Sequence, residues 1–137
     1  MADSLPGGSL RAYRDFDDSI EVVGLDIDAE TLFSEERIVT HQADQTNLER
    51  LCKLGSAYRS ELNLLIDDGY HFLPANINSI LAFFPNVVQG GYIVIEDIPK
   101  RRFHSYLVVS NILNKLEIVN YFWQDESGSY QLVIQKQ

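Results

Sequence analysis

One stretch, residues 62–71, constrains the fold more than any other part of the sequence. It reads Leu-Asn-Leu-Leu-Ile-Asp-Asp-Gly-Tyr-His, an apolar run that ends abruptly in two carboxylates, a glycine and a histidine. A short apolar run without polar alternation is typical of a strand buried on both faces of a sheet. Because ligands of open α/β sheets bind outside the carboxyl ends of the strands, we expect Asp67, Asp68 and His71 to lie at a functional edge.

A second stretch repeats this pattern. Residues 90–97 predict a Gly-Gly turn and a buried strand that ends in Glu96 and Asp97. Two neighbouring parallel strands would bring both acidic pairs and His71 to one edge of the sheet. Such a group predicts either a divalent metal site or a base whose pKa is adjusted by its neighbours. The alternative is that the acidic pairs form only a turn and a solvated strand end.

Composition narrows the class of protein. The chain has 137 residues, 45% of them hydrophobic, and a net charge of −9, which fits one acidic globular domain. Nucleic acid is not expected as a partner, because phosphate contacts need clustered Lys and Arg, and the only basic cluster, residues 100–102, is expected to be a solvated loop or helix start. The sequence has no apolar run of about 18 residues and no signal-peptide pattern, so we expect a cytoplasmic protein without a membrane partner. The single cysteine, Cys52, is expected to be buried in a helix.

Strand-like and helix-like segments alternate along the chain. The expected strands are 20–28, 37–42, 62–67, 92–96, 117–123 and 130–134. The expected helices are 10–16, 29–33, 46–57, 71–84 and 99–115. This alternation predicts an α/β fold with a parallel sheet and right-handed crossovers, and the turn at 125–129 adds a terminal antiparallel hairpin.

Three further segments predict ligand contacts. Gly7-Gly8-Ser9 precedes a helix and either presents backbone N–H groups to a ligand or is simply a turn. Asp26 ends a strand, where a carboxylate can accept hydrogen bonds from a ribose diol. Capping the next short helix is the alternative role, for which Asp28 is the better candidate. Asp44 and Gln45 follow another strand, and they either contact the edge of a nucleotide base or form a polar surface loop.

In their order and spacing, these motifs resemble those of class I S-adenosylmethionine-dependent methyltransferases. Within that class they most resemble the metal-dependent O-methyltransferases of macrolide sugars, a group that includes proteins called cephalosporin hydroxylases. The resemblance covers residues 7–98. Its most specific part is Ile-Asp-Asp-Gly-x-His at 66–71 with Ile-Glu-Asp at 95–97, although Tyr70 stands where the family usually has Ser. The resemblance implies a Rossmann-like methyltransferase sheet, mostly parallel, with a C-terminal antiparallel hairpin.

The resemblance also implies a site for S-adenosylmethionine. Within it, Asp26 would bind the ribose, Asp44 and Gln45 would lie near the adenine, and the Gly-Gly-Ser turn would flank the methionine part. The complete implied set is Gly7, Gly8, Ser9, Asp26, Asp44, Gln45 and Asp67.

The implied reaction is methyl transfer from this cofactor to a hydroxyl of a small molecule, which in this family is a sugar. Asp68, Glu96 and Asp97 would hold Mg²⁺, and His71 would be the general base. A sugar hydroxyl keeps its proton at neutral pH, so a metal that stabilises the alkoxide and a histidine that takes the proton suit the chemistry. A hydroxylase or hydrolase on the same scaffold is a weaker alternative, because the His-rich triad of non-haem iron and a Gly-x-Ser-x-Gly elbow are both absent.

One element of that fold is missing from the sequence pattern. In the family, the Gly-Gly-Ser loop follows a buried strand in the middle of the sheet, but here only Met1–Pro6 precede it. We therefore expect residues 1–137 to form a single incomplete domain that lacks the first central strand. Three outcomes are then possible. The two flanking strands could pair directly, a homo-oligomer could cover the opening, or the sequence could be an N-terminally truncated fragment. We expect one of the first two. A non-catalytic binding or interaction module is accordingly the alternative to an enzyme.

Overall fold

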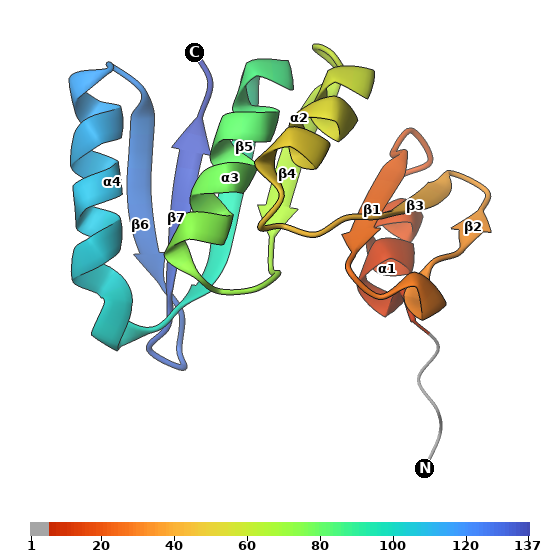
Figure 1. Cartoon of the computed structure of the whole chain (residues 1–137), viewed down its shortest axis with the longest axis horizontal. Coiled ribbons are helices and arrows are strands. Elements are labelled where there is room, and N and C mark those ends of the chain that lie inside the picture. Colours follow the sequence, from red (N-terminus) through yellow and green to blue (C-terminus); the bar gives the residue numbers. More distant parts are fainter. Residues whose placement is uncertain (1–5) are drawn as a thin grey trace. The chain divides into compact units, whose positions relative to one another are not determined.

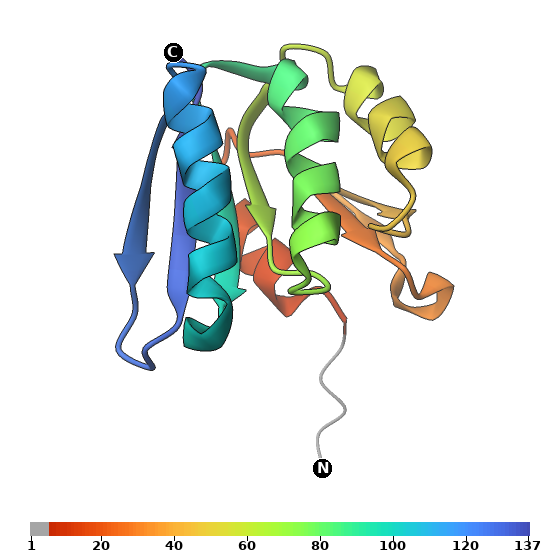
Figure 2. The same cartoon turned by 60° about the vertical axis from the view of Figure 1, so that its left-hand side comes forward.

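The computed structural model describes residues 6–137, so the expectation that residues 1–5 form no strand lies outside the described residues. The chain divides into two compact units, Met1–Asp44 and Gln45–Gln137. Each unit carries a sheet of its own, as Figures 1 and 2 show. The expected α/β class is confirmed, with parallel strand pairs and a C-terminal antiparallel hairpin.

The first unit contains one helix and a three-stranded sheet. Helix α1 (Gly8–Phe16) precedes strand β1 (Val22–Asp26), which pairs in parallel with β3 (Ile38–Gln42). The 3₁₀ turn η1 (Ala29–Thr31) leads into β2 (Ser34–Glu35), a short strand that the sequence pattern did not predict. Because β2 pairs antiparallel with β3, the sheet order is β1–β3–β2.

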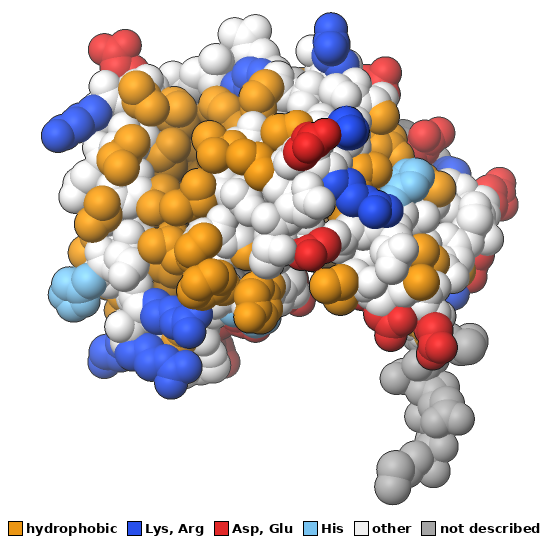
Figure 3. All heavy atoms as spheres, viewed as in Figure 1, with side chains coloured by type: hydrophobic (Ala, Val, Ile, Leu, Met, Phe, Trp, Pro, Cys, Tyr) orange, Lys and Arg blue, Asp and Glu red, His pale blue; other side chains and the backbone are white. Residues whose placement is uncertain are grey.

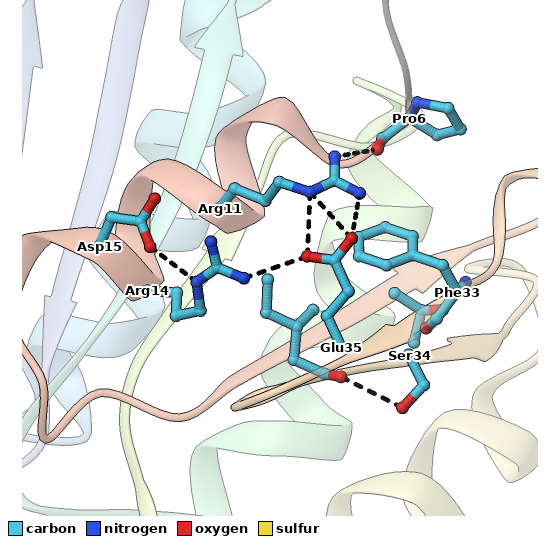
Figure 4. A network of polar contacts seen from close by, with 9 residues as sticks. Pro6, Arg11, Arg14, Asp15, Phe33, Ser34 and Glu35 are labelled. Atoms are coloured by element: carbon cyan, nitrogen blue, oxygen red, sulfur yellow. Dashed lines mark hydrogen bonds and ion pairs between the residues drawn. The ribbon is translucent and has the colours of Figure 1, made fainter.

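Polar contacts hold α1 within this unit, since none of its residues is buried. The Glu35 carboxylate of β2 accepts hydrogen bonds from Arg11 (2.6 Å) and Arg14 (3.0 Å), as Figure 4 shows. The Arg11 guanidinium also lies 4.6 Å from the centre of the Phe33 ring. At the other end of the helix, Arg37 Nη1 donates to three backbone carbonyls at and beyond the C-terminus of α1. Single exposed ion pairs stabilise little, so these contacts act together as a network, and the half-buried Leu10 adds a contact with Gly24 of β1.

The second unit is a four-stranded mixed sheet in the order β4–β5–β7–β6. Strands β4 (Leu62–Asp67) and β5 (Val87–Ile98) are parallel, whereas β7 (Tyr130–Gln135) is antiparallel to both β5 and β6 (Val119–Gln124). The helices of this unit are α2 (Leu48–Ala57), α3 (Leu73–Phe83), the 3₁₀ turn η2 (Phe84–Asn86), the 3₁₀ turn η3 (Lys100–Arg102) and α4 (Phe103–Lys115). Figure 2 shows α3 and α4 on one face of the sheet.

The hydrophobic core lies between that face and the helices. Alternate residues of β5 and β7 point into it, and they are at most 1% exposed: Ile93, Ile95, Leu132 and Ile134. Tyr106 and Leu113 of α4 pack against them. The opposite face of the sheet carries large apolar side chains that are 37–57% exposed: Leu64, Tyr92, Tyr121 and Trp123. Apolar side chains also remain exposed on the face that carries α3 and α4, as Figure 3 shows.

The two sheets remain separate. β1 is an edge strand of the first sheet and β4 an edge strand of the second, and among residues 6–137 no strand pairing joins them. The structure of residues 6–137 therefore does not show the expected direct pairing of these two strands. Within the described residues, each of the two strands pairs on one side only and keeps an unpaired edge.

Two local expectations are also corrected. Strand 62–67 is not buried on both faces, because it lies at a sheet edge and leaves Leu64 51% exposed. Cys52 is exposed and not buried, because it lies on the outer side of α2. None of the described helices has the length and apolar character that a membrane crossing requires.

Gly55 tests the packing of α2 on α3. A Cβ at this buried position would lie 2.5 Å from the backbone oxygen of Ala82, so Gly55→Ala is expected to lower the free energy of unfolding by about 1–3 kcal/mol. Urea denaturation measures the change. Gly8→Ala is the control, because a Cβ there meets no atom within 4 Å and alanine favours a helix. Equal effects of the two substitutions would contradict this packing.

Candidate active site

The carboxyl ends of β4 and β5 bring three of the expected side chains together. Asp68 and His71 follow β4, and Asp97 lies near the end of β5. One potential ligand atom from each of the three lies within 4.8 Å of the others. The parallel register, which places Asp67 of β4 beside Ile95 of β5, causes this meeting because it aligns the two strand ends.

Glu96 belongs to the same electrostatic environment. Its partial burial raises the pKa of its carboxyl, and the neighbouring charges of Asp68 and Asp97 raise it further, while His71 lowers it. A carboxyl whose pKa is raised in this way is poorly compensated by the protein alone. A divalent cation would relieve this repulsion, and oxygen ligands suit Mg²⁺.

The His71 ring has one enclosed and one outward nitrogen. Its Nδ1 is buried and has no hydrogen-bond partner among residues 6–137. Its Nε2 lies 3.8 Å from Asp68 Oδ1. The donors present, carboxylate oxygens and one imidazole, fit a divalent cation with a histidine base beside it.

The backbone at this edge is strained. His71 and Asp97 have φ angles of +47° and +50°, in the left-handed region that residues other than glycine rarely adopt. Each such conformation costs about 1 kcal/mol or more and persists where other contacts hold it. Two of the five described non-glycine residues with positive φ angles thus belong to the group of three.

Arg102 connects the two loops that carry this group. Its Nη1 donates a 2.7 Å hydrogen bond to the backbone oxygen of His71, and its guanidinium lies 6.0 Å from the centre of the Phe72 ring. Arg102 itself follows Asp97 by five residues, in η3. The contact therefore ties the loop after β4 to the loop after β5. The sequence analysis missed this role, because it took residues 100–102 as a solvated cluster and had no signal for their orientation.

The Asp67 carboxylate has a different environment from its neighbour Asp68. Asp67 is buried, and its oxygens accept hydrogen bonds from Gln45 Nε2 (2.6 and 2.7 Å) and Asn76 Nδ2 (2.9 Å). Gln45 Oε1 in turn accepts from the Tyr70 N–H at 2.9 Å. The side chains of Asp67 and Gln45, both expected at the cofactor, thus bind each other and hold the loop that carries Asp68 and His71. The buried Asn76 was not anticipated.

The remaining expected residues lie in the first unit. Gly7 has a φ of +84°, and a Cβ there would lie 2.2 Å from the Phe33 ring, so this turn requires glycine. Gly8 and Ser9 are exposed in the first turn of α1, and Asp44 is half-buried at the end of the unit.

Asp28, and not Asp26, caps the short helix after β1, as expected. Asp28 accepts a hydrogen bond from the Glu30 N–H at 2.9 Å and caps η1. Asp26 is exposed at the end of β1, where its Oδ1 accepts only a local bond from the Asp28 N–H. Its second oxygen has no bond among those described, so Asp26 can still receive a hydroxyl donor.

No family model matches the chain, but individual relatives do. Mycinamicin VI 2''-O-methyltransferase of Micromonospora griseorubida is 40% identical over 91 residues, which is 66% of this chain. Demethylmacrocin O-methyltransferase of Streptomyces fradiae is 38% identical over 92 residues, or 67% of this chain. The chain is homologous to part of these O-methyltransferases. It spans 23% of the length of each of these two curated relatives.

Solved structures agree with this relationship. The MycE methyltransferase of the mycinamycin biosynthetic pathway, in complex with Mg and SAH, gives a TM-score of 0.77 at 25% identity. The match covers 98% of this chain and 41% of MycE. A second MycE structure, with Mg, SAH and mycinamycin VI, gives a TM-score of 0.74 at 26% identity over 95% of this chain and 40% of MycE. The resemblance to macrolide-sugar O-methyltransferases and the methyltransferase fold are thereby confirmed.

Glu96→Gln is expected to stabilise the metal-free protein at pH 7 and above. The raised pKa means that the folded protein binds this proton more tightly than the unfolded chain does. Ionised Glu96 therefore lowers the free energy of unfolding at pH values above its folded-state pKa. This destabilisation is absent below the ordinary pKa of Glu, about 4.3, where the carboxyl is protonated in both states. Thermal unfolding in a chelator from pH 4 to 8 measures the gain, which should shrink as the pH falls. Glu61→Gln, at an exposed carboxyl, is the control, and an equal gain in both variants would refute the explanation.

Arg102→Gln is expected to lower the free energy of unfolding by about 1–2 kcal/mol, because it removes a charged donor from the His71 carbonyl. Arg101→Gln removes the same charge from an exposed neighbour and should change stability by less than about 0.5 kcal/mol. Chemical denaturation of both variants measures the two changes in the free energy of unfolding. A loss of similar size at both positions would reflect net charge alone.

Proposed function

We propose that this chain takes part in S-adenosylmethionine-dependent, Mg²⁺-assisted methyl transfer to a hydroxyl of a small molecule, a sugar in particular. The observation that carries the proposal is the convergence of Asp68, His71 and Asp97 within 4.8 Å at the carboxyl ends of two parallel strands. The homology to O-methyltransferases supports the type of reaction. The Mg and SAH bound to MycE support both cofactors.

In the proposed site, Asp68, Glu96 and Asp97 hold the metal through carboxylate oxygens. When bound, Mg²⁺ supplies a Lewis acid that lowers the pKa of the acceptor hydroxyl, and S-adenosylmethionine supplies an electrophilic methyl group. His71 accepts the hydroxyl proton at Nε2, since its Nδ1 is enclosed. Asp68 Oδ1, 3.8 Å from that nitrogen, stabilises the imidazolium that results. The acceptor oxygen gains the methyl group, and the carbon–sulfur bond breaks.

The cofactor-binding residues are proposed from the first unit and from the loop after it. Asp26 receives the ribose hydroxyls, Asp44 lies at the adenine, and the Gly7-Gly8-Ser9 turn presents backbone groups to the methionine part. Gln45 and Asp67 act as supports of the loop that borders the cofactor. In this proposal the two units are parts of one incomplete methyltransferase-like domain.

A non-catalytic binding or interaction module of the same fold is the second candidate. The observation that favours it is the unpaired edge that β1 and β4 each present. An edge strand without a partner is a site for pairing with another chain. Both candidate functions are compatible with a homo-oligomer. Light scattering, measured alongside the binding experiments, would detect it.

Asp97→Asn and His71→Ala separate the proposed roles. Asp97→Asn is expected to weaken Mg²⁺ binding by at least about 10-fold, because it removes a charged ligand. His71→Ala is expected to slow methyl transfer by about 10²-fold or more while Mg²⁺ still binds. Calorimetric titration of Mg²⁺ and S-adenosylmethionine, with single-turnover transfer to a glycoside, measures these effects.

Glu126→Gln, at an exposed carboxyl in the hairpin turn, is the matched control and should alter neither quantity. Micromolar binding of S-adenosylmethionine together with the expected variant effects would support the enzyme. A folded wild-type protein that binds neither the metal nor the cofactor would reject it in favour of the second candidate.

A further inference from the structure

The strand register of the second unit creates a continuous apolar surface on the sheet face opposite α3 and α4, called the open face below. One row of paired residues crosses the sheet from Leu64 through Tyr92 to Val119, and the next crosses from Ile66 through Val94 to Tyr121. Paired residues on one face of a sheet lie side by side, so the two rows form one surface. Trp123, two residues after Tyr121 on β6, extends it.

Large side chains of the open face remain in contact with solvent. Tyr121 and Trp123 are 52% and 57% exposed, and Leu64 and Tyr92 are 51% and 37% exposed. Sheets with parallel strands usually carry helices on both faces. In the second unit, however, α3 and α4 lie on the other face, as Figure 2 shows, and α2 packs on α3. The open face is therefore not covered by a helix of its own unit.

The area of the open face is sufficient for a weak dimer. The exposed parts of its four largest side chains amount to roughly 400 Å², because an aromatic side chain offers about 150–250 Å² when it is fully exposed. A dimer interface of standard size buries about 800 Å² on each copy, so these four side chains supply about half of that area. The half-buried Ile66 and Val94 and the backbone of the two rows add to it.

The distribution of charge favours a second copy of the chain over a partner of opposite charge. The chain has a net charge of −9, yet neither row contains Asp, Glu, Lys or Arg. The core of a protein interface is likewise depleted of charged residues. Two copies that meet through these rows bring no like charges into direct contact. A basic partner would find no carboxylate in the rows with which to pair.

We propose that the open face of one molecule packs on the open face of a second copy, as the two sheets of a sandwich do at a distance of about 10 Å. The contact is symmetric, so the same residues meet from both copies. It removes Tyr121 and Trp123 from water, and aromatic side chains of this kind commonly dominate the binding energy of an interface. The inference goes beyond the proposed function, because the two rows contain none of the proposed metal ligands and not the proposed base.

Trp123 is the only tryptophan of the chain, so its fluorescence reports on the open face directly. As the wild-type protein is concentrated, we expect the emission to move to shorter wavelength and its quenching by acrylamide to fall, with a midpoint on the order of 10 μM. Sedimentation equilibrium should show conversion of monomer to dimer with the same midpoint. Added NaCl should lower the midpoint, because it screens the repulsion between two molecules that each have a charge of −9. A monomer at all concentrations, with unchanged emission, would overturn the inference.

Tyr121→Thr assigns the association to the open face. It removes an aromatic ring but keeps a residue that suits a strand, and it should weaken the dimer by at least about 10-fold. Val108→Thr is the control, because Val108 is 58% exposed on α4, on the opposite face, and the midpoint should stay as in the wild type. Circular dichroism checks that both variants fold, and the wild-type fluorescence decides if Tyr121→Thr does not. Equal midpoints for two folded variants would contradict the proposed contact.

Hydrogen exchange separates this contact from strand pairing along the unpaired edge of β4. Packing of two faces leaves the outward N–H groups of β4 without a new partner, so their exchange should be similar in monomer and dimer. A dimer that slows exchange along β4 while Trp123 stays open to acrylamide would overturn the inference in favour of edge pairing. A monomer in which acrylamide does not reach Trp123 at any concentration would also overturn it, because the open face would then be covered within one chain.

Discussion

The buried carboxylate of Asp67 is the constraint on which the ligand-bearing edge depends. A charge removed from water must be matched by donors, and here two side-chain amides provide them, Gln45 ahead of α2 and Asn76 within α3. Asn76 in turn accepts a hydrogen bond from the hydroxyl of Tyr106 in α4. One carboxylate at a strand end thereby joins a loop and two helices. The adjacent Asp68, by contrast, is exposed.

The sequence predicted which side chains meet at this edge, but it did not predict the contacts that support them. The acidic ends of two parallel strands located Asp68, His71 and Asp97, because parallel strands in register align their carboxyl ends. Asp67 is the last residue of β4 and pairs with the buried Ile95, whereas Asp68 lies beyond the strand, so the sequence pattern alone did not separate their roles. The contact of Arg102 with a residue 31 positions earlier could not be read from a pattern, because it depends on how two loops pack. The division into two sheets is likewise a matter of long-range pairing.

Stability and function oppose each other at this edge. Three carboxylates lie near one imidazole, the Glu96 pKa is raised, and two residues hold left-handed backbones. Each feature costs folding free energy, and the surrounding structure offsets it through Arg102 and the Asp67 network. Functional sites commonly carry such costs, because a ligand that compensates the charges is present only when the site works. A positive partner bound at this edge would offset these costs.

The unpaired edge of β4 has a thermodynamic consequence. β4 ends at Asp67, so any strand that pairs along it would order the same segment that orients Asp68 and His71. It would also cover part of the exposed Leu64. Strand addition and ligand binding are then linked equilibria, in which each changes the affinity of the other by the same factor. The affinity of the edge for a ligand would then depend on the concentration of any chain that pairs along β4.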